Sequence, residues 1–444
     1  MPPPLLPGFA AATWHQADGP GPAAVSWARG ELARQALVVV VWDFAVMGGT
    51  FGERDATAWV AACAAAEADR VPLVAVTSSG GTRLQEGIPA LVGMARATIA
   101  RERLAAAGVP LIAVVGQPTA GGVWVTVAAR ADLRIAVRHA TVGFAGPRVV
   151  EAVTGVHVGD DSHTAESALA AGLVDVVLPA GEVEVAVVRV LGAWHSTPAE
   201  PGPTGSGGGE WDRDPWAVVQ QARAPRSWSA GSLLDGLVLE ATPLAAPRGD
   251  TTARATIGRL EGRGVVAVAL AAEQHGNPTP DAYRLLSRAA TVADRWRLPL
   301  VTLVDTPGAD PRPPSEADAL AAAIGDAFAA VLACRSPTLG LLVGEGGSGG
   351  ALAALVCDRL LRTPTSYFAA LAPEGAAAAL KSSPEEAAAD LSLRPEDLDR
   401  VFDGWIDAPP TAPSIAAHLT ALAGQDPDMR RQTRAQRWVG PVPI

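Results

Sequence analysis

Short apolar runs alternate along this chain with longer segments whose apolar residues recur at helical spacing. The run LVAVTSSGG, from Leu73, is followed by IPALVGMARATIARERLAAAG, from Ile88, in which apolar positions recur every three to four residues. This change of period predicts a strand, a polar turn containing glycine, and then a helix. Repeated alternation of this kind predicts parallel strands covered by helices, which is an α/β fold.

The same pattern occurs twice. VPLVAVTSSGGTRLQEG in the first half corresponds to LPLVTLVDTPGADPRPP in the second, and VPLIAVVGQPTAGGVWV corresponds to SPTLGLLVGEGGSGGAL. Gly81 and Gly308 lie 227 positions apart, and so do Gly122 and Gly349. A constant offset between several features indicates a tandem duplication.

A segment rich in Pro, Gly and Ser separates the two halves. It reads STPAEPGPTGSGGGE and has no hydrophobic periodicity, which is typical of a linker. We therefore predict a first domain over residues 1–195, a linker over 196–213 and a second domain over 214–444.

Glycines cluster where the predicted strands end. They form four turns: Gly80-Gly81 and Gly121-Gly122 in the first half, and Asp305–Gly308 and Gly349–Ala351 in the second. Glycine leaves the backbone N–H groups of such a turn open to close approach by a ligand oxygen. Ligands of α/β sheets lie at the carboxyl ends of the strands. Two converging turns in each half therefore predict an oxyanion hole, with donors fixed where negative charge develops.

The second glycine cluster could also hold a nucleophilic serine or bind a phosphate, and each function requires particular residues nearby. GGSGG, with Ser348 at its centre, satisfies the G-x-S-x-G pattern of a nucleophilic serine, but the only histidine after it is His418, and the corresponding TAGGV of the first half has no serine. A phosphate-binding loop requires Gly-Lys followed by Ser or Thr, and no lysine is present there. The oxyanion interpretation is favoured.

Composition narrows the range of functions further. The net charge of −11 argues against nucleic-acid binding, which requires a basic surface. Cys63, Cys334 and Cys357 form no C-x-x-C pair, which excludes a zinc ribbon, and we expect buried thiols and no metal. We find neither a signal peptide in MPPPLLPGFA nor an uninterrupted apolar run of membrane-spanning length, so we expect a cytoplasmic protein.

Longer motifs resemble one enzyme family. DFAVMGGTFG, SSGGTRLQEG, QPTAGGVWV and GFAGPRVVE resemble the β subunit of bacterial acetyl-CoA carboxylase carboxyltransferase. GNPTPDAYR, DTPGADP, GEGGSGGALA and PEGAA resemble its α subunit. The resemblance covers residues 20–180 and 215–405, in order and with matching spacing. It implies two tandem crotonase-like domains of the ClpP/crotonase ββα superhelix type.

The resemblance also implies how the two halves divide the work. The β-like half is the acyl-CoA side, with Gly81 and Gly122 facing a thioester enolate. The α-like half is the side of carboxybiotin on a carrier protein, with Gly308, Gly350 and Ala351 facing the ureido group. Biotin itself serves as the base, and the site lies between halves, commonly across a dimer. The remaining candidates for substrate binding are Gly80, Arg83, Gly121, Val123, Gly146, Arg148 and Gly349, and Arg83 and Arg148 could equally be structural.

Some features depart from this family. The β subunit's Cys₄ zinc ribbon is absent, the two subunit types are fused, and a lysine-containing GEK tripeptide corresponds here to Ala56-Thr57-Ala58. A carrier protein and a biotin carboxylase must be separate partners, because the sequence has no biotinylation motif of the MKM type and no ATP-grasp domain. The main prediction is carboxyl transfer from carboxybiotin to acetyl-CoA or a related acyl-thioester, by a homodimer or higher homo-oligomer.

Two alternatives remain open. One is a biotin-independent decarboxylase of malonyl-CoA, a malonyl carrier or another β-carboxylated substrate, because decarboxylation also passes through an enolate held in an oxyanion hole. The other is a non-catalytic assembly subunit, which predicts eroded glycines although all four turns are intact. The sequence leaves open the acyl chain and whether CoA or a carrier bears it.

Overall fold

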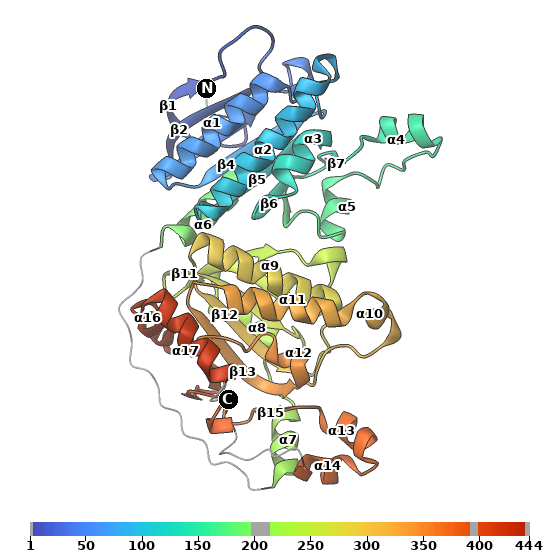
Figure 1. Ribbon diagram of the computed structural model, residues 1–444, viewed down its shortest axis with the longest axis vertical. Coiled ribbons are helices and arrows are strands. Elements are labelled where there is room, and N and C mark those ends of the chain that lie inside the picture. The colour runs from blue at the N-terminus through green and yellow to red at the C-terminus, as the bar shows by residue number, and fades with distance from the viewer. Residues whose placement is uncertain (1–2, 197–213, 391–397, 440–444) are drawn as a thin grey trace. The chain divides into compact units, whose positions relative to one another are not determined.

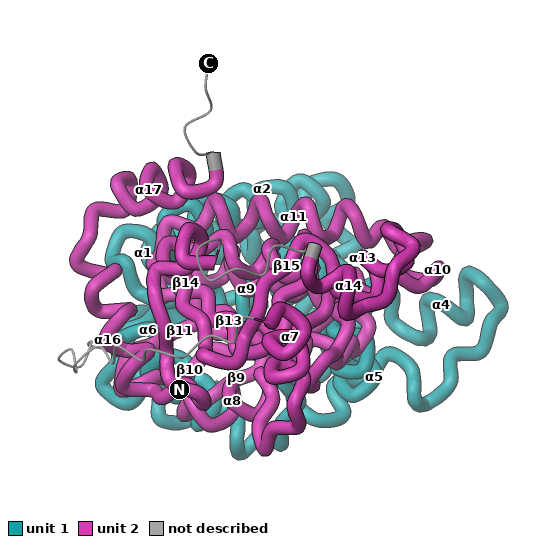
Figure 2. Tube along the Cα trace, turned by 90° about the horizontal axis from the view of Figure 1, so that it is seen from below, with its two compact units in different colours: residues 1–195 teal, residues 196–444 magenta. Residues whose placement is uncertain are grey.

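The computed structural model describes residues 3–196, 214–390 and 398–439. The chain divides into two compact units, residues 1–195 and 196–444, which Figure 2 distinguishes by colour. The predicted linker over 196–213 lies outside the described residues, except for Ser196.

The first unit is built on one mixed sheet with the strand order β1-β2-β3-β4-β5-β6-β8. Strands β1 to β3 are antiparallel, the pairs from β3 to β8 are parallel, and β7 pairs with the end of β5. The strands are β1 (Ala10–His15), β2 (Val25–Leu32), β3 (Gln35–Trp42), β4 (Leu73–Ser79), β5 (Leu111–Ala120), β6 (Leu133–Val137), β7 (Val142–Gly143) and β8 (Val176–Leu178).

The second unit repeats this sheet, with the order β9-β10-β11-β12-β13-β14-β16 and β15 paired with the end of β13. Its pairings have the same sense, as the tandem duplication predicts. The strands are β9 (Leu239–Leu244), β10 (Ala253–Leu260), β11 (Arg263–Leu270), β12 (Leu300–Thr306), β13 (Thr338–Gly347), β14 (Arg359–Arg362), β15 (Tyr367–Ala369) and β16 (Gly404–Trp405).

In each unit two long helices lie side by side over the sheet, α1 with α2 and α9 with α11 (Figure 1). The first unit contains α1 (Glu53–Asp69), α2 (Ile88–Ala106), α3 (Gly121–Val123), α4 (Pro147–Thr154), α5 (Ala165–Ala170) and α6 (Val183–Trp194). The second contains α7 (Pro215–Arg223), α8 (Ala230–Leu237), α9 (Pro280–Trp296), α10 (Pro313–Ala317), α11 (Leu320–Ala333), α12 (Ser348–Leu352), α13 (Pro373–Leu380), α14 (Pro384–Asp390), α16 (Ala412–Ala423) and α17 (Pro427–Val439).

Each sheet begins with an antiparallel hairpin that the sequence pattern did not predict. In the first unit the hairpin turns through Ala33 and Arg34, whose φ angles are +49° and +65°, and in the second through Glu261 and Gly262, at +48° and +75°. A two-residue turn with two positive φ angles matches the twist of antiparallel strands. Ala-Arg is not a recognisable turn pair, so the alternation of strands and helices indicated the parallel strands and not the hairpin at this edge.

The C-terminal helix α17 is attached to the second unit through a buried arginine. The guanidinium of Arg434 donates to the carbonyl oxygens of Val331, Leu332 and Cys334, at 3.2, 2.9 and 2.7 Å, and lies 3.6 Å from a carboxylate oxygen of Asp358. These carbonyls end α11, where a helix has no donors of its own to satisfy them. Arg434 therefore caps α11 and neutralises a buried acid.

We expect Arg434→Ala to lower the free energy of unfolding of the second unit by about 3 kcal/mol, because it leaves several carbonyls without a donor and removes one of the two arginines beside the buried Asp358 carboxylate. Urea denaturation followed by circular dichroism measures this change. The matched control is Arg431→Ala on the same helix. Arg431 is half exposed and pairs with Asp428 at 4.0 Å, so its loss should cost less than about 0.5 kcal/mol. Equal effects of the two substitutions would refute the capping role.

Candidate active site

The ends of β4 and β5 approach so closely in the first unit that glycine is required between them. Ser79 pairs with Thr119 in the parallel ladder, which brings the two following turns together. The φ angles of Gly81 and Gly121 are +118° and +57°. A Cβ atom on Gly121 would lie 2.8 Å from the Gly81 Cα atom. Both the backbone conformation and the space therefore select glycine at position 121.

The first of these turns is fixed by its own hydrogen bonds. The Gly80 N–H donates to the Gly48 carbonyl at 2.9 Å, and the Gly81 N–H donates to the Ser79 hydroxyl at 3.1 Å. Sequence reasoning proposed Gly81 as an oxyanion donor, and the structure shows that its N–H already has an acceptor within the turn.

The second turn of the first unit presents donors where α3 begins. The Gly121 N–H donates to the Phe144 carbonyl at 3.0 Å, which holds the loop after β7 against the turn. Gly122 and Val123 follow in the first helical turn, where backbone N–H groups have no acceptor inside the helix. A Cβ atom on Gly122 would lie 2.6 Å from the Thr82 hydroxyl. The N–H groups of Gly122 and Val123 are thus next to the Gly81 turn.

The second unit repeats this arrangement with different side chains. The φ angle of Gly308 is +143°, and its N–H donates to the Thr306 hydroxyl at 3.1 Å, as Gly81 does to Ser79. A Cβ atom on Gly347 would lie 1.8 Å from the Pro307 carbonyl oxygen, so the end of β13 can only be glycine. In the following turn Gly349 is exposed, whereas Gly350 and Ala351 are buried.

Ser348 takes the place in the second unit that Gly121 has in the first, with a φ angle of +65°. It is not part of a triad with His418. That histidine lies 3.1 Å from Arg359, which pairs with Leu339 at the start of β13, whereas Ser348 follows the end of the same strand. Nine residues of strand separate the two ends by about 30 Å. The Ser348–His418 pair that the G-x-S-x-G pattern would require is therefore excluded.

A buried charged cluster supports the second unit's turns, and sequence reasoning missed it. Glu345 in β13 is 1% exposed and accepts from the His275 ring nitrogen Nδ1 at 2.5 Å, the Tyr367 hydroxyl at 2.6 Å and Arg223 Nε at 2.9 Å. Arg223 also donates to Glu374, and this hydrogen bond, with the nearby Glu345 charge, raises the pKa of Arg223. One signal was available, because Glu345 interrupts an otherwise apolar strand.

A second buried acid lies directly beside this cluster. Asp305 in β12 is completely buried, forms an ion pair with Arg226 and accepts a hydrogen bond from the Glu345 N–H at 2.9 Å. Burial raises the pKa of Asp305, and the charge of Arg226 opposes this shift. The carboxylate therefore fixes the end of β12 to β13, directly before the turn that carries Gly308.

The loop after β11 holds the Gly308 turn from the other side. The Thr306 hydroxyl donates to the Gly276 carbonyl at 2.7 Å, and the Asn277 side chain donates to the Gly308 carbonyl at 2.8 Å. His275, adjacent to Gly276, is the residue bound to Glu345. The loop, the turn and the charged cluster thus form one hydrogen-bonded assembly.

The two predicted arginines have different surroundings. Arg83 is 1% exposed and forms an ion pair with the buried Asp55 at 2.6 Å, a second with Glu86 at 3.0 Å, and a hydrogen bond to the Thr50 carbonyl at 2.5 Å. Its guanidinium is therefore held by protein groups. Arg148, by contrast, is exposed in α4, which projects from the body of the first unit (Figure 1). Gly146 directly precedes that helix.

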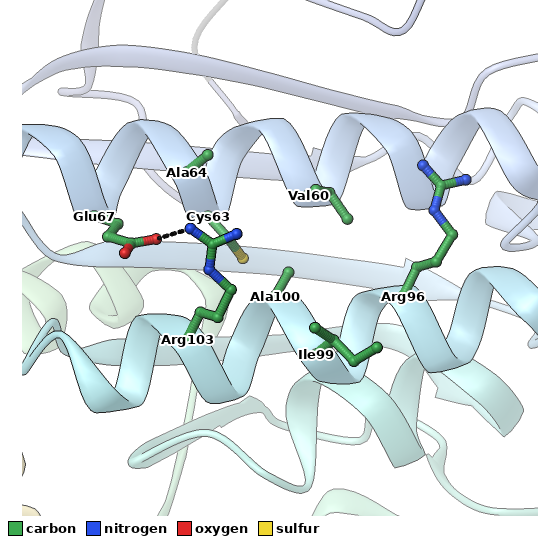
Figure 3. Close-up of a pocket in the computed structure, with 8 residues that line it drawn as sticks. All are labelled: Val60, Cys63, Ala64, Glu67, Arg96, Ile99, Ala100 and Arg103. Carbon is green, nitrogen blue, oxygen red and sulfur yellow. Dashed lines mark hydrogen bonds and ion pairs between the residues drawn. The ribbon is translucent and has the colours of Figure 1, made fainter.

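Two pockets of the first unit differ in their relation to the turns. The larger, of about 560 Å³, lies where β3, β4 and β5 end, and its lining includes Trp42, Phe44, Ser78 and Gln117. The smaller, of about 180 Å³, is a groove between α1 and α2 (Figure 3). It exposes no reactive thiol, because burial raises the pKa of Cys63, which also faces the groove. Cys334 and Cys357 are likewise buried.

Two features are absent from the described part of the chain, a metal-binding cluster and a membrane-spanning helix. No group of three or more His, Cys, Asp or Glu side chains there is arranged to hold a metal ion. No helix in those segments combines the length and apolar character needed to span a membrane.

Comparison with known proteins assigns the two halves to related families. Residues 11–200 match the carboxyl transferase domain, and residues 214–428 match the acetyl co-enzyme A carboxylase carboxyltransferase-like family.

Curated relatives extend over most of the chain. The acetyl-coenzyme A carboxylase carboxyl transferase subunits beta/alpha of Salinispora tropica are 37% identical over 87% of this chain and 73% of their own length. The corresponding protein of Saccharopolyspora erythraea is 33% identical over 88% of this chain and 74% of its length. A probable biotin-dependent acyl-coenzyme A carboxylase beta3 subunit of Mycobacterium tuberculosis is 30% identical over 93% and 88%.

Solved structures share the fold at lower identity. Transcarboxylase 12S, solved with methylmalonyl-coenzyme A and methylmalonic acid bound, is 22% identical, with a TM-score of 0.76 over 91% of this chain and 82% of its own. A single-chain, multi-domain long-chain acyl-CoA carboxylase is 18% identical, with a TM-score of 0.70 over 90% of this chain and 41% of its own. The predicted fold class, tandem crotonase-like α/β units, is confirmed. The chain belongs to the acetyl-CoA carboxylase carboxyltransferase family, as a fused form of its β and α subunits.

Proposed function

We propose that this protein transfers a carboxyl group from carboxybiotin, borne by a separate carrier protein, to acetyl-CoA or a related acyl-thioester. The observation that supports this proposal most directly is the repeated pair of meeting turns, one pair in each unit, in a chain of the carboxyltransferase family. A reaction with two substrates that each gain negative charge on an oxygen requires two such sites.

We assign the acyl-thioester to the first unit. The N–H groups of Gly122 and Val123 would hold the thioester oxygen. Gly81 and Gly121 lack side chains and so leave room for this oxygen to reach them. The cavity where β3, β4 and β5 end has the size of a site for a small organic ligand, and we assign part of the coenzyme to it.

We assign the biotin ureido group to the second unit. Gly349 is exposed, and the next two residues, Gly350 and Ala351, are buried. A ligand oxygen that reaches the turn would therefore meet backbone N–H groups that no large side chain covers. Carboxybiotin, when bound, supplies both the carboxyl group and the base that removes a proton from the acyl α-carbon. The chain's own groups therefore have to orient the two substrates and stabilise the two oxygens.

We assign Arg83 a positioning role. Its ion pair with Asp55 connects the Gly81 turn to the start of α1, because Asp55 also accepts from the Gly52 N–H at 2.9 Å. Arg148 and Gly146 remain candidates for contacts with the substrate, because Arg148 is exposed.

We further propose that the chain is cytoplasmic and acts as a homo-oligomer with a biotin carboxylase and a biotin carrier as partners. Exposed apolar side chains support self-association: Leu84, Ile88 and Ile99 at and along α2, and Phe144, Val149 and Val153 at and along α4. An exposed apolar surface of this kind is typical of an interaction site.

The first prediction concerns the reaction run in reverse. Purified protein incubated with malonyl-CoA should form acetyl-CoA at an appreciable rate only when free biotin or a biotinylated carrier is added. Chromatography of the CoA species measures both arms. Rapid acetyl-CoA formation without biotin would instead establish the alternative, a biotin-independent decarboxylase, and no turnover in either arm would support an assembly subunit.

A second prediction separates the two units. Gly121→Ala adds a Cβ atom 2.8 Å from the Gly81 backbone, and Gly350→Ala adds one 2.9 Å from the Ala309 nitrogen. Each turn must open, and we expect each variant to lose about 100-fold in the assay above. Gly121→Ala should raise the KM for malonyl-CoA, whereas Gly350→Ala should raise the KM for biotin.

The matched control is Gly325→Ala in α11, where an added Cβ atom meets open space. This change should leave the rate unaltered and stabilise the helix by about 1 kcal/mol. Full activity of Gly121→Ala or Gly350→Ala, or an effect of each on the other substrate's KM, would contradict the assignment of the two sides.

A third prediction concerns assembly. Val153→Asp, at a position 78% exposed in α4, should reduce the particle mass measured by light scattering, because a charge at an apolar interface has to be desolvated. Val185→Asp, at a position 60% exposed in α6, is the control and should leave the mass unchanged. A monomeric wild-type particle would contradict the proposed oligomer.

A further inference from the structure

The hydroxyl of Tyr283 stands apart from the other buried polar groups of the second unit. Tyr283 lies in the first turns of α9 and is completely buried, and its hydroxyl has no hydrogen-bond partner among the described residues. Burial raises the pKa of this hydroxyl, so it keeps its proton at neutral pH and can donate. A buried donor without an acceptor is unfavourable, and such a group in a native structure calls for a partner.

The position of the hydroxyl indicates which partner. A Cβ atom on Gly350 would lie 2.5 Å from the Tyr283 hydroxyl oxygen and 2.9 Å from the Ala309 nitrogen. The hydroxyl, the backbone of the turn after β13 and the backbone of the turn after β12 therefore converge on one small region. It is the region in which Gly350 and Ala351 are proposed to receive a ligand oxygen.

Helix α9 is held rigidly at this place. It begins directly after the loop whose Asn277 donates to the Gly308 carbonyl at 2.8 Å, and the Asp310 N–H donates to the Pro278 carbonyl at 2.9 Å. Two hydrogen bonds, one on each side of Ala309, thus connect the loop before α9 to the Gly308 turn. A hydroxyl fixed in this way can donate without reorganising during a reaction, which is the condition for an effective oxyanion donor.

The first unit lacks this group. Helices α1 and α9 begin and end at positions 227 residues apart, so Tyr283 corresponds to Ala56, and Gly350 corresponds to Val123. Both residues of the first unit are buried and apolar. The second unit thus has a large side chain, Tyr283, where the first has alanine, and a glycine, Gly350, where the first has valine. The exchange keeps the space filled and adds a hydroxyl on one side only.

We propose that Tyr283 is a catalytic residue of the second unit, whose hydroxyl donates a hydrogen bond to the ligand oxygen received at the Gly350 turn. On the proposed function, this oxygen belongs to the ureido group of biotin. The inference rests on that function for the identity of the ligand, and on the unpartnered hydroxyl for the site. Gly350 is glycine because any side chain there would displace the donor.

The test is Tyr283→Phe, which removes the hydroxyl and keeps the ring. In the malonyl-CoA and biotin assay we expect kcat to fall about 10-fold or more, with the KM for malonyl-CoA unchanged. The denaturation midpoint should stay the same or rise, because no protein hydrogen bond is lost. The rise in melting temperature caused by saturating free biotin should shrink in the variant, while the rise caused by acetyl-CoA should not.

Tyr367→Phe is the matched control, because it removes a buried tyrosine hydroxyl that does have a partner, Glu345 at 2.6 Å. It should lower the denaturation midpoint. Wild-type kcat and an unchanged biotin effect in Tyr283→Phe would overturn the inference, as would a fall in its denaturation midpoint like that of Tyr367→Phe. Failure of the proposed function is a separate result, in which the wild-type protein itself shows neither biotin-dependent turnover nor stabilisation by biotin.

Discussion

The architecture of both units depends on bringing the backbones of two neighbouring strand ends into van der Waals contact. Two paired parallel strands lie at a fixed spacing. The turns that follow their neighbouring ends can therefore contact each other only where side chains are missing. Gly121 would collide with Gly81, and Gly347 with Pro307, if either carried a Cβ atom. The contact explains why the glycines occur in pairs, and it leaves N–H groups as the chemical surface that a ligand meets.

Duplication preserved the backbone of this contact while the side chains around it changed. The hydroxyl of Ser79 in the first unit and that of Thr306 in the second each accept a hydrogen bond from the N–H of the glycine two residues later, at the same distance of 3.1 Å. Around this shared backbone the second unit has Ser348 at a left-handed position and the charged cluster of Glu345, which the first unit does not share. Two units with the same turns can therefore bind different partners.

The sequence was sufficient to predict the α/β fold, the repeat and the turns, because glycine pairs after apolar runs are local signals. It could not predict the hairpin at Ala33 and Arg34, since neither residue is typical of positive φ angles. The partners of Glu345 were also inaccessible. Arg223 lies 122 positions away in the chain, and only the folded sheet brings the two side chains together. The sequence left the role of Arg83 open between ligand binding and structure, because it does not show the buried Asp55 beside it.

The charges near the turns explain why backbone donors carry the proposed chemistry. Arg83, Arg223 and Arg226 each form an ion pair with a carboxylate that is at most 1% exposed, so their charges are compensated within the protein. A free arginine at either turn would bind a carboxylated substrate before reaction as strongly as during it, and such uniform binding does not accelerate the chemical step. Neutral N–H groups in fixed positions preferentially stabilise the transition state, in which negative charge develops on a single oxygen. The ion-paired arginines thus fix the conformation of the turns, and the turns orient the backbone N–H groups toward the ligand oxygen.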